Sequence, residues 1–351
     1  HAIVGIPYVM GVVVIALVSF CYLVTAGYWG VSTTDIIQGI TIAVSCLLVA
    51  VIVITKSGGV TEAVTYMGSV SPSHIRPSSG LTFAQLFSWA GVWALIAFGQ
   101  PQLVTKFMGL RDSRTVGTVI RVAVVWEIIF MVSIAMIGAA AFKLFGAVPF
   151  DNVDAIVPTL VAEHTNAVVS GIFLCGILAA GLSTTVALVL TSSGAVTKDI
   201  YEDYYCIRSH AKQDSGKSVR ISRAATGIIL VVVVIGAIYP PDFIWSLSTM
   251  SAGVMGAAFT APLVLGLYWK RATRQGCMAG IIGGSAISII WYFAGLTSVV
   301  HSFVPGTAVS FLLMVMVSFC TPEMEKEHLD VFFEPGCSKD KIQAAIAAGN
   351  K

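Results

Sequence analysis

An apolar segment with several hydroxyl side chains is the first part of this sequence that could do chemistry. It reads GILAAGLSTTVALVLTSSGAVTKDIY and occupies residues 176–201. On an α-helix, with about 100° per residue, Ala180, Ser183, Thr184 and Thr191 fall on one stripe. Such hydroxyls can bond to the carbonyl one turn earlier, while small residues let helices pack closely. The alternative is that Ser183, Thr184 and the carbonyl of Ala180 form half of an oxygen cage for a hard cation.

Two further stretches place a carboxylate and a helix breaker beside apolar segments. Asp35, in TTDIIQG, stands where a helix is expected to begin, and its carboxylate would cap the free backbone N–H groups there. Gly99, Gln100 and Pro101 interrupt another apolar segment. Because proline removes a hydrogen bond and clashes with the preceding turn, the helix must bend or break at this point.

The elements that must position these residues are membrane-spanning helices. Of the 351 residues, 56% are hydrophobic and only 11% are charged, and the mean hydropathy is +0.88. A soluble domain of this length could not bury so much apolar surface. Apolar runs of about 20 residues cross the hydrocarbon core of a bilayer. They predict an all-α integral membrane protein with nine transmembrane helices, at residues 3–25, 35–55, 84–107, 118–142, 168–196, 221–239, 243–268, 277–295 and 304–320.

The loops between these segments alternate between many and few Lys and Arg residues. This alternation predicts that the first helix runs from outside to inside and that residues 321–351 form a cytoplasmic tail. Glu127 lies within an expected span near Arg121, and we interpret it as an ion-paired or water-exposed carboxylate without a transport role. His1 directly precedes an apolar segment and no initiator methionine is present, so an N-terminal truncation is expected.

Neither charge nor motif indicates a nucleic-acid partner, a cofactor or an enzyme. The formal net charge is only +2. The seven cysteines show no CxxC or Cys/His spacing, so neither a disulfide framework nor a metal centre of that kind is indicated. The sequence has no HExxH or GxSxG motif, and its histidines, His301 among them, are dispersed in expected loops or the tail.

Four stretches of the sequence resemble the sodium:solute symporter family. LAAGLSTTVALVLTSSGAVTKDIY resembles the family signature, in which a Ser-Ser/Thr pair precedes S-S-x-x-T-x-D-h-Y. FGQPQLVTKFMGLRDSRTV resembles its F-G-Q-P segment, and CYLVTAGYWGVSTTDIIQG resembles its Tyr-rich helix end with Thr-Asp-x-x-Gln. APLVLGLYWKRATRQGCMAGIIGG resembles its later helices. The likeness runs up to residue 320, and within the family it is greatest to sodium/pantothenate symporters, with sodium/proline symporters also similar.

The resemblance implies a fold and a domain organisation. The fold is a leucine-transporter-like bundle with two inverted five-helix repeats. Residues 1–320 would form the transmembrane symporter domain, with core helices four to ten plus two further helices. The first core helices would then be missing, and residues 321–351 would follow as the cytoplasmic tail.

The resemblance also implies roles for individual residues. The family binds sodium between core helices one and eight, so the Ala180 carbonyl, Ser183 and Thr184 would supply this chain's half of the site. Asp35 matches an aspartate tied to sodium binding or coupling, which is the alternative to its capping role. The interrupted segment lines the solute pocket in the family. Its candidate solute-binding residues here are Trp93, Ala97, Gln100 and Pro101.

Four positions leave alternatives or depart from the family pattern. Trp93 matches a tryptophan of the proline symporters, although ordinary packing would also account for it. Ala97 stands where those proteins have a tyrosine, which favours a different and larger solute. Some members bind a second sodium through two further serines, where this chain has Val186 and Ala187. One sodium ion per solute is therefore expected.

The implied function is sodium-coupled import of a small organic solute by alternating access across the plasma membrane or the bacterial inner membrane. Pantothenate or a related carboxylate is the first expectation, and proline or another amino acid is the second. A symporter-like membrane sensor is the alternative from another class. Sodium as coupling ion, the solute and the lipid bilayer are the expected partners of a monomeric protein.

Overall fold

The computed structural model describes residues 5–76, 80–110, 113–146, 152–206, 208–209, 214–239, 244–324, 329 and 333. Over these residues, all regular secondary structure is helical. Eight helices are long and apolar enough to cross a membrane, and a ninth apolar stretch, Phe83–Gly99, is shorter. Each corresponds to one of the nine predicted segments, so the all-α membrane fold is confirmed. The predicted tail lies outside the described residues beyond Met324, apart from Leu329 and Phe333.

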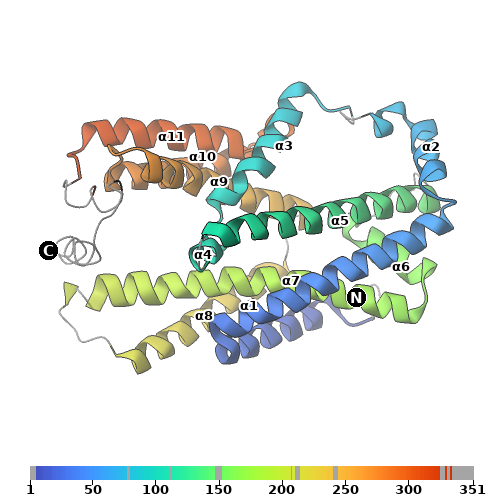
Figure 1. Ribbon diagram of the computed structural model, residues 1–351, viewed down its shortest axis with the longest axis horizontal. Helices are drawn as coiled ribbons and strands as arrows, with labels where there is room; N and C mark the ends of the chain where they lie inside the picture. The colour runs from blue at the N-terminus through green and yellow to red at the C-terminus, as the bar shows by residue number, and fades with distance from the viewer. Residues whose placement is uncertain are drawn as a thin grey trace. The chain divides into compact units, whose positions relative to one another are not determined.

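The chain divides into two compact units, and the first comprises His1–Gly80 and Gly109–Phe243. Its α-helices are α1 (Tyr8–Lys56), α2 (Val60–Val70), α5 (Ser113–Phe145), α6 (Ile156–His164), α7 (Ala167–Ala195) and α8 (Ser215–Ile238). A π-helical segment, Val196–Cys206, continues α7. Helix α7 packs along α1 (Figure 1). A buried apolar cluster joins α1 and α7 with α2, α5 and α6, and it includes Val53, Ile137, Leu160 and Phe173.

Helix α1 contains two membrane segments joined at one residue. Gly27 has φ 59° and ψ −169°, whereas the residues on either side of it are helical. An L-residue with a side chain rarely adopts this φ, so glycine permits the kink. The two segments are Tyr8–Thr25 and Gly30–Lys56. Asp35 therefore lies more than one turn inside the second segment, and the expectation that it caps a helix N-terminus is wrong.

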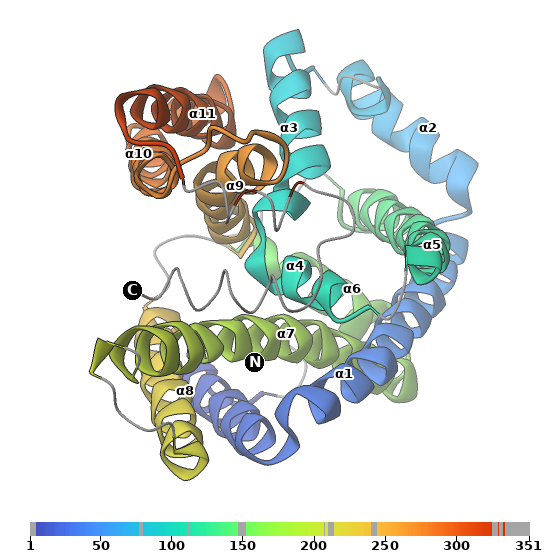
Figure 2. The ribbon, with the colours of Figure 1, turned by 60° about the vertical axis from the view of Figure 1, so that its left-hand side comes forward.

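The second unit comprises Leu81–Met108 and Ile244–Lys351. Its helices are α3 (Phe83–Leu95), the 3₁₀ segment η2 (Ile96–Gly99), α4 (Pro101–Met108), α9 (Ile244–Tyr268), α10 (Arg274–Phe293) and α11 (Phe303–Cys320). Figure 2 shows α3 alongside α9, with α10 and α11 next to it. Val92 and Ile96 pack against Phe303 in a buried cluster. The cluster joins the end of α3 to α11, and Ala252 of α9 packs against it.

Local capping explains where several of these helices begin. Thr82 and Gln85 form a reciprocal capping box at the start of α3. The side chain of Asn166 accepts a hydrogen bond from the backbone N–H of Val169 at the start of α7. Each cap satisfies a backbone donor that has no partner inside its helix.

The predicted helix at residues 84–107 is interrupted where Pro101 indicated. Helix α3 ends at Leu95, η2 tightens the chain as far as Gly99, and Gln100 is extended with φ −103° and ψ 102°. Pro101 then occupies the first position of α4, where its missing N–H costs no intrahelical bond. The predicted break is confirmed, and it consists of a 3₁₀ turn followed by one extended residue.

Candidate functional site

Three predicted oxygens meet on α7. The hydroxyl of Ser183 donates to the carbonyl oxygen of Ala180 at 3.0 Å. The hydroxyl of Thr184 donates to the same oxygen at 3.1 Å. Ser183 is half-buried and Thr184 is exposed. The structure thus brings Ala180, Ser183 and Thr184 together as one oxygen cluster, which we call the α7 oxygen cluster.

Other hydroxyls of α7 bond back to carbonyls in the same way. Thr191 donates to Ala187 and Ser192 donates to Leu188, both at 2.8 Å. Back-bonding alone is therefore common along this helix and does not mark a cation site. Within the described part of α7, the Ala180 carbonyl differs because two hydroxyls converge on it. That convergence places three oxygens where a hard cation could contact them together.

A cavity of 390 Å³ lies between α1, α5, α6 and α7 and has Ala180 in its wall. Its lining is apolar apart from Ser45 and Cys46 of α1. The Ser45 hydroxyl donates to the carbonyl of Ile42 at 3.0 Å, so its proton is engaged within its own helix. The cavity leaves space beside the turn of α7 that carries the oxygen cluster.

Asp35 lies in the same unit, on the second segment of α1. It is half-buried and close enough to Tyr22 to interact electrostatically. Val31, one turn before Asp35, packs in one cluster with Val186 and Val189 of α7. This stretch of α1 therefore lies against α7 in the turns that follow the oxygen cluster.

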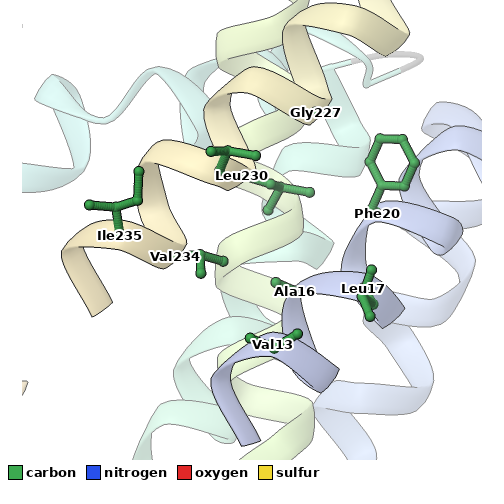
Figure 3. A pocket seen from close by; sticks show the side chains of 9 residues that line it. Val13, Ala16, Leu17, Phe20, Gly227, Leu230, Val234 and Ile235 are labelled. Atoms are coloured by element: carbon green, nitrogen blue, oxygen red, sulfur yellow. The ribbon is translucent and has the colours of Figure 1, made fainter. Parts of the chain in front are cut away.

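A second cavity, of 350 Å³, has only apolar side chains. It lies between the first segment of α1 and α8 (Figure 3). It is lined by Val13, Ala16, Leu17, Phe20, Gly227, Leu230, Val231, Val234 and Ile235. A site for a polar solute needs at least a few polar groups to fix the solute's orientation. This groove therefore does not fit the predicted solute pocket.

In the second unit, the break after α3 presses against α9 through two glycines. A Cβ atom on Gly99 would lie 2.5 Å from Cα of Gly256 and 2.9 Å from the carbonyl oxygen of Met255. Only glycine permits this approach. The carbonyl of Gln100 caps α4 by accepting from the backbone N–H groups of Leu103 and Val104. The break is therefore held in place by backbone contacts on both of its sides.

Trp93 is not buried in the core of its unit. Its side chain is 57% exposed, and its ring lies 6.1 Å from that of Trp245 at the start of α9. Ala97 is exposed, whereas Gln100 and Pro101 are half-buried. The structure thus places the four predicted solute-binding residues at the break: Trp93 on α3, Ala97 on η2, Gln100 in the extended connection and Pro101 at the start of α4, with Trp93 and Ala97 open to the outside of their unit.

Sequence patterns did not identify Trp245, which lies beside Trp93, or His301, which contacts Trp89 one turn earlier on α3. Trp245 carried no motif, and His301 was interpreted as a loop histidine of no chemical interest. His301 does lie between α10 and α11, but its side chain is only 1% exposed. It contacts Trp89 of α3, with the ring centroids 4.9 Å apart. No local sequence pattern signals such a contact, because the two residues come from distant parts of the chain.

Glu127 is exposed, as one of its two interpretations required. Arg121 points the other way along α5 and donates to the carbonyl of Gly117 at 3.2 Å and to the hydroxyl of Thr118 at 3.4 Å. The Arg121 side chain thus bonds to its own helix, and contact of Glu127 with water stays a prediction.

A polytopic helical bundle with an interrupted helix and an oxygen cluster on another helix defines the class of membrane transporters with discontinuous helices. More particularly, the chain belongs to the sodium:solute symporter family, whose model matches residues 1–284. The family is one of transporters, in agreement with the expectation that the chain is not an enzyme. The spans and the family together make it a multi-pass membrane protein.

Curated relatives with similar sequences include two proline transporters of Bacillus subtilis strain 168. The osmoregulated proline transporter OpuE is 28% identical over 334 residues, which cover 93% of this chain and 66% of OpuE. The high-affinity proline transporter PutP is 27% identical over 334 residues, which cover 95% of this chain and 70% of PutP. The chain thus spans about two thirds of the length of the curated relatives it matches.

Among solved structures, the chain resembles a Na⁺-coupled sialic acid symporter in a substrate-bound outward-open state. The TM-score is 0.73 at 20% identity, and the match covers 92% of this chain and 69% of that one. At this identity the likeness shows the fold, and the predicted leucine-transporter-like bundle is confirmed.

Proposed function

We propose that this protein is a sodium-coupled symporter that imports a small organic solute, with residues 1–320 as the transport domain and 321–351 as a cytoplasmic tail. The observation that carries the proposal is the convergence of the Ser183 and Thr184 hydroxyls on the Ala180 carbonyl. These residues stand in the segment that resembles the family signature. Three oxygens do not enclose a cation, so further ligands must come from outside α7. From the resemblance to the family, we expect these ligands on core helix one.

For the solute, we favour proline or another small amino acid over pantothenate. The relatives OpuE and PutP are proline transporters, and the comparisons give pantothenate no support. Trp93 offers an exposed indole ring next to the break, which suits contact with an apolar ring or side chain of a solute. Ala97 leaves more room than the tyrosine of proline symporters. We therefore include amino acids larger than proline among the candidates.

We further propose a coupling ratio of one sodium ion per solute. Val186 is 1% exposed and belongs to an apolar cluster with Leu23, Val31 and Leu230. An apolar side chain packed in this way offers no ligand for a second cation. At about 100 mV, one inward charge supplies about 2.3 kcal/mol, and a roughly tenfold sodium gradient adds about 1.4 kcal/mol. A zwitterionic solute could then be concentrated several hundredfold at equilibrium.

The test is uptake of labelled proline, larger amino acids and pantothenate into proteoliposomes that contain the full-length protein. We expect uptake of an amino acid that depends on an inward sodium gradient and is accelerated by an inside-negative potential. The reversal potential at known gradients gives the coupling ratio. Sodium-independent binding without accumulation of any solute would favour the sensor alternative and contradict the proposal.

A further inference from the structure

The N-terminal half of α3 is tied to the loop between α10 and α11. The side-chain amide of Gln85 donates to the carbonyl of Ser298 at 2.6 Å. The backbone N–H of His301 donates to the hydroxyl of Ser88 at 3.3 Å. The indole N–H of Trp291 donates to the carbonyl of Val300 at 2.9 Å, which ties the loop to α10 as well. These bonds fix the backbone that carries His301.

The imidazole of His301 is itself held in one orientation. Its Nδ1 accepts the backbone N–H of Phe303 at 3.2 Å, so the proton of the neutral ring belongs on Nε2. Burial lowers the pKa of His301, which favours this neutral form. A Cβ on Gly253 of α9 would lie 3.0 Å from Cε1 of His301, so that helix packs closely against the ring. The groups facing the ring from α3, α9 and α11 in these contacts are Trp89, Gly253 and Phe303, none of which carries a charge.

The imidazole lies at the end of a row of three tryptophans. His301 and Trp89 contact edge to face, at 4.9 Å and 63° between ring planes. Trp89 stacks on Trp245 at 5.9 Å and 23°. Trp245 in turn lies 6.1 Å from Trp93 at 33°. Trp89 and Trp93 are one turn apart on α3, so Trp245 of α9 contacts both rings of that face.

Exposure changes along this row. His301 is 1% exposed at one end, whereas Trp245 and Trp93 are 51% and 57% exposed at the other. A rigid, buried ring therefore supports a row of indoles that becomes progressively accessible. The exposed indole of Trp93 pairs with the ring of Trp245, so its orientation depends on the ring behind it.

We propose that His301 is a positioning residue that orients the Trp89–Trp245–Trp93 row and thereby sets how Trp93 contacts the solute. This proposal rests on the proposed function, because it assigns the row to the solute pocket. It adds that the affinity for solutes with an apolar ring or side chain depends on a residue that never touches the solute. The sodium site plays no part in this dependence.

The test compares two substitutions of His301, of which one removes the ring and the other removes the hydrogen-bond acceptor. His301→Asn keeps an acceptor for the N–H of Phe303 but removes the ring that contacts Trp89. His301→Phe keeps a ring against Trp89 but removes the acceptor. His74→Asn is the matched control, because His74 is exposed and contacts Phe142 in the other unit. All variants are measured as purified full-length protein after size-exclusion chromatography.

Two readouts separate positioning from a general structural role. For His301→Asn we expect the half-saturating solute concentration to rise about two- to tenfold, the range worth one edge-to-face ring contact. Its half-saturating sodium concentration and maximal rate should stay unchanged. The near-ultraviolet circular dichroism of the stacked indoles should weaken. In His301→Phe, the solute affinity and the circular dichroism should both lie between those of His301→Asn and those of the unsubstituted protein. The control should match the unsubstituted protein.

Unchanged solute affinity and unchanged circular dichroism in His301→Asn would overturn the inference. Equal losses in solute affinity, sodium affinity and maximal rate would overturn it too, since they indicate a general structural defect. If His301→Asn does not fold, Trp89→Phe takes its place. This substitution replaces the indole that contacts both His301 and Trp245 with a smaller ring, and the same readouts are expected. The circular dichroism needs no transport, so a protein that lacked uptake would contradict the proposed function while still testing how His301 orders the row.

Discussion

The geometry of the α7 oxygen cluster depends on neighbouring residues of one helix, whereas the geometry of the break after α3 depends on contacts between residues far apart in the sequence. The three oxygens of the cluster come from residues 180–184 of one helix, and helical geometry alone brings them together. The break at Gly99 is shaped by Gly256 of α9, and the ring of Trp93 by Trp245. A site of the first kind can lose one ligand at a time, whereas a site of the second kind depends on a close fit between distant segments. Substitutions should therefore have graded effects at the first and disruptive effects at the second.

The largest effect is expected from Gly99→Ala. The added Cβ would lie 2.5 Å from Cα of Gly256, and backbone atoms cannot move aside as a side chain can. Overpacking of this kind costs about 1–3 kcal/mol. We expect a lower unfolding temperature of the detergent-solubilised protein and loss of most solute uptake.

Gly91→Ala is the matched control for this substitution. Gly91 lies in α3, the helix that precedes the break, and a Cβ placed on it would meet nothing within 4 Å. Alanine in a helix interior is favoured over glycine by about 0.5–1 kcal/mol, so stability should stay the same or rise slightly. Equal stability and uptake in the two variants would show that the approach of Gly99 to Gly256 does not hold the break in place.

The sequence was sufficient where one helix or one residue type determines the geometry. The stripe of Ala180, Ser183 and Thr184 follows from helical periodicity, and Pro101 directly after Gly99 and Gln100 favours the end of one helix and the start of another. The nine apolar segments follow from the thickness of the bilayer. These features could be predicted because each depends on a few neighbouring residues or on the membrane as solvent.

The sequence was insufficient where local propensity had competitors or where distant residues meet. Asp35 is a good N-cap by type, but the kink lies at Gly27, and the membrane segment Gly30–Lys56 passes through Asp35 as a continuous helix. The burial of His301 depends on Ser88 and Trp89, more than two hundred residues earlier (213 for Ser88). No local pattern encodes either outcome.

An intermediate effect is expected from Thr184→Ala, which removes one oxygen of the α7 cluster. One lost interaction of this kind is worth about 1–1.5 kcal/mol, so the half-saturating sodium concentration should rise about tenfold. Solute affinity at saturating sodium should change little, and Thr184→Ser, which keeps the hydroxyl, should restore sodium affinity. Uptake measured over a sodium series gives both values.

Thr191→Ala provides the control for the loss of a hydroxyl. Thr191 bonds back to the carbonyl of Ala187 on the same helix, and among the residues that the structure describes no second hydroxyl bonds to that carbonyl. Its removal should leave the sodium dependence as it was. If Thr184→Ala and Thr191→Ala behave alike, back-bonding is the whole role of these hydroxyls, and Thr184 leaves the proposed cation site.

The smallest effect is expected from Asp35→Asn, which tests whether the carboxylate serves the cation. The substitution keeps the shape and the hydrogen-bonding oxygen of the side chain but removes its charge, and no helix cap is lost because Asp35 lies inside α1. A charge that acts on the ion without ligating it contributes about 0.5–1 kcal/mol in a partly solvated setting. The half-saturating sodium concentration should therefore rise about two- to fivefold, and the shift should shrink at high ionic strength, because screening weakens such an interaction.

Glu127→Gln is the control, since Glu127 is an exposed carboxylate on another span with no proposed role. An equal shift in both variants would mean that sodium affinity responds to the overall charge of the protein, whereas no shift in Asp35→Asn would leave sodium binding to oxygen ligands alone.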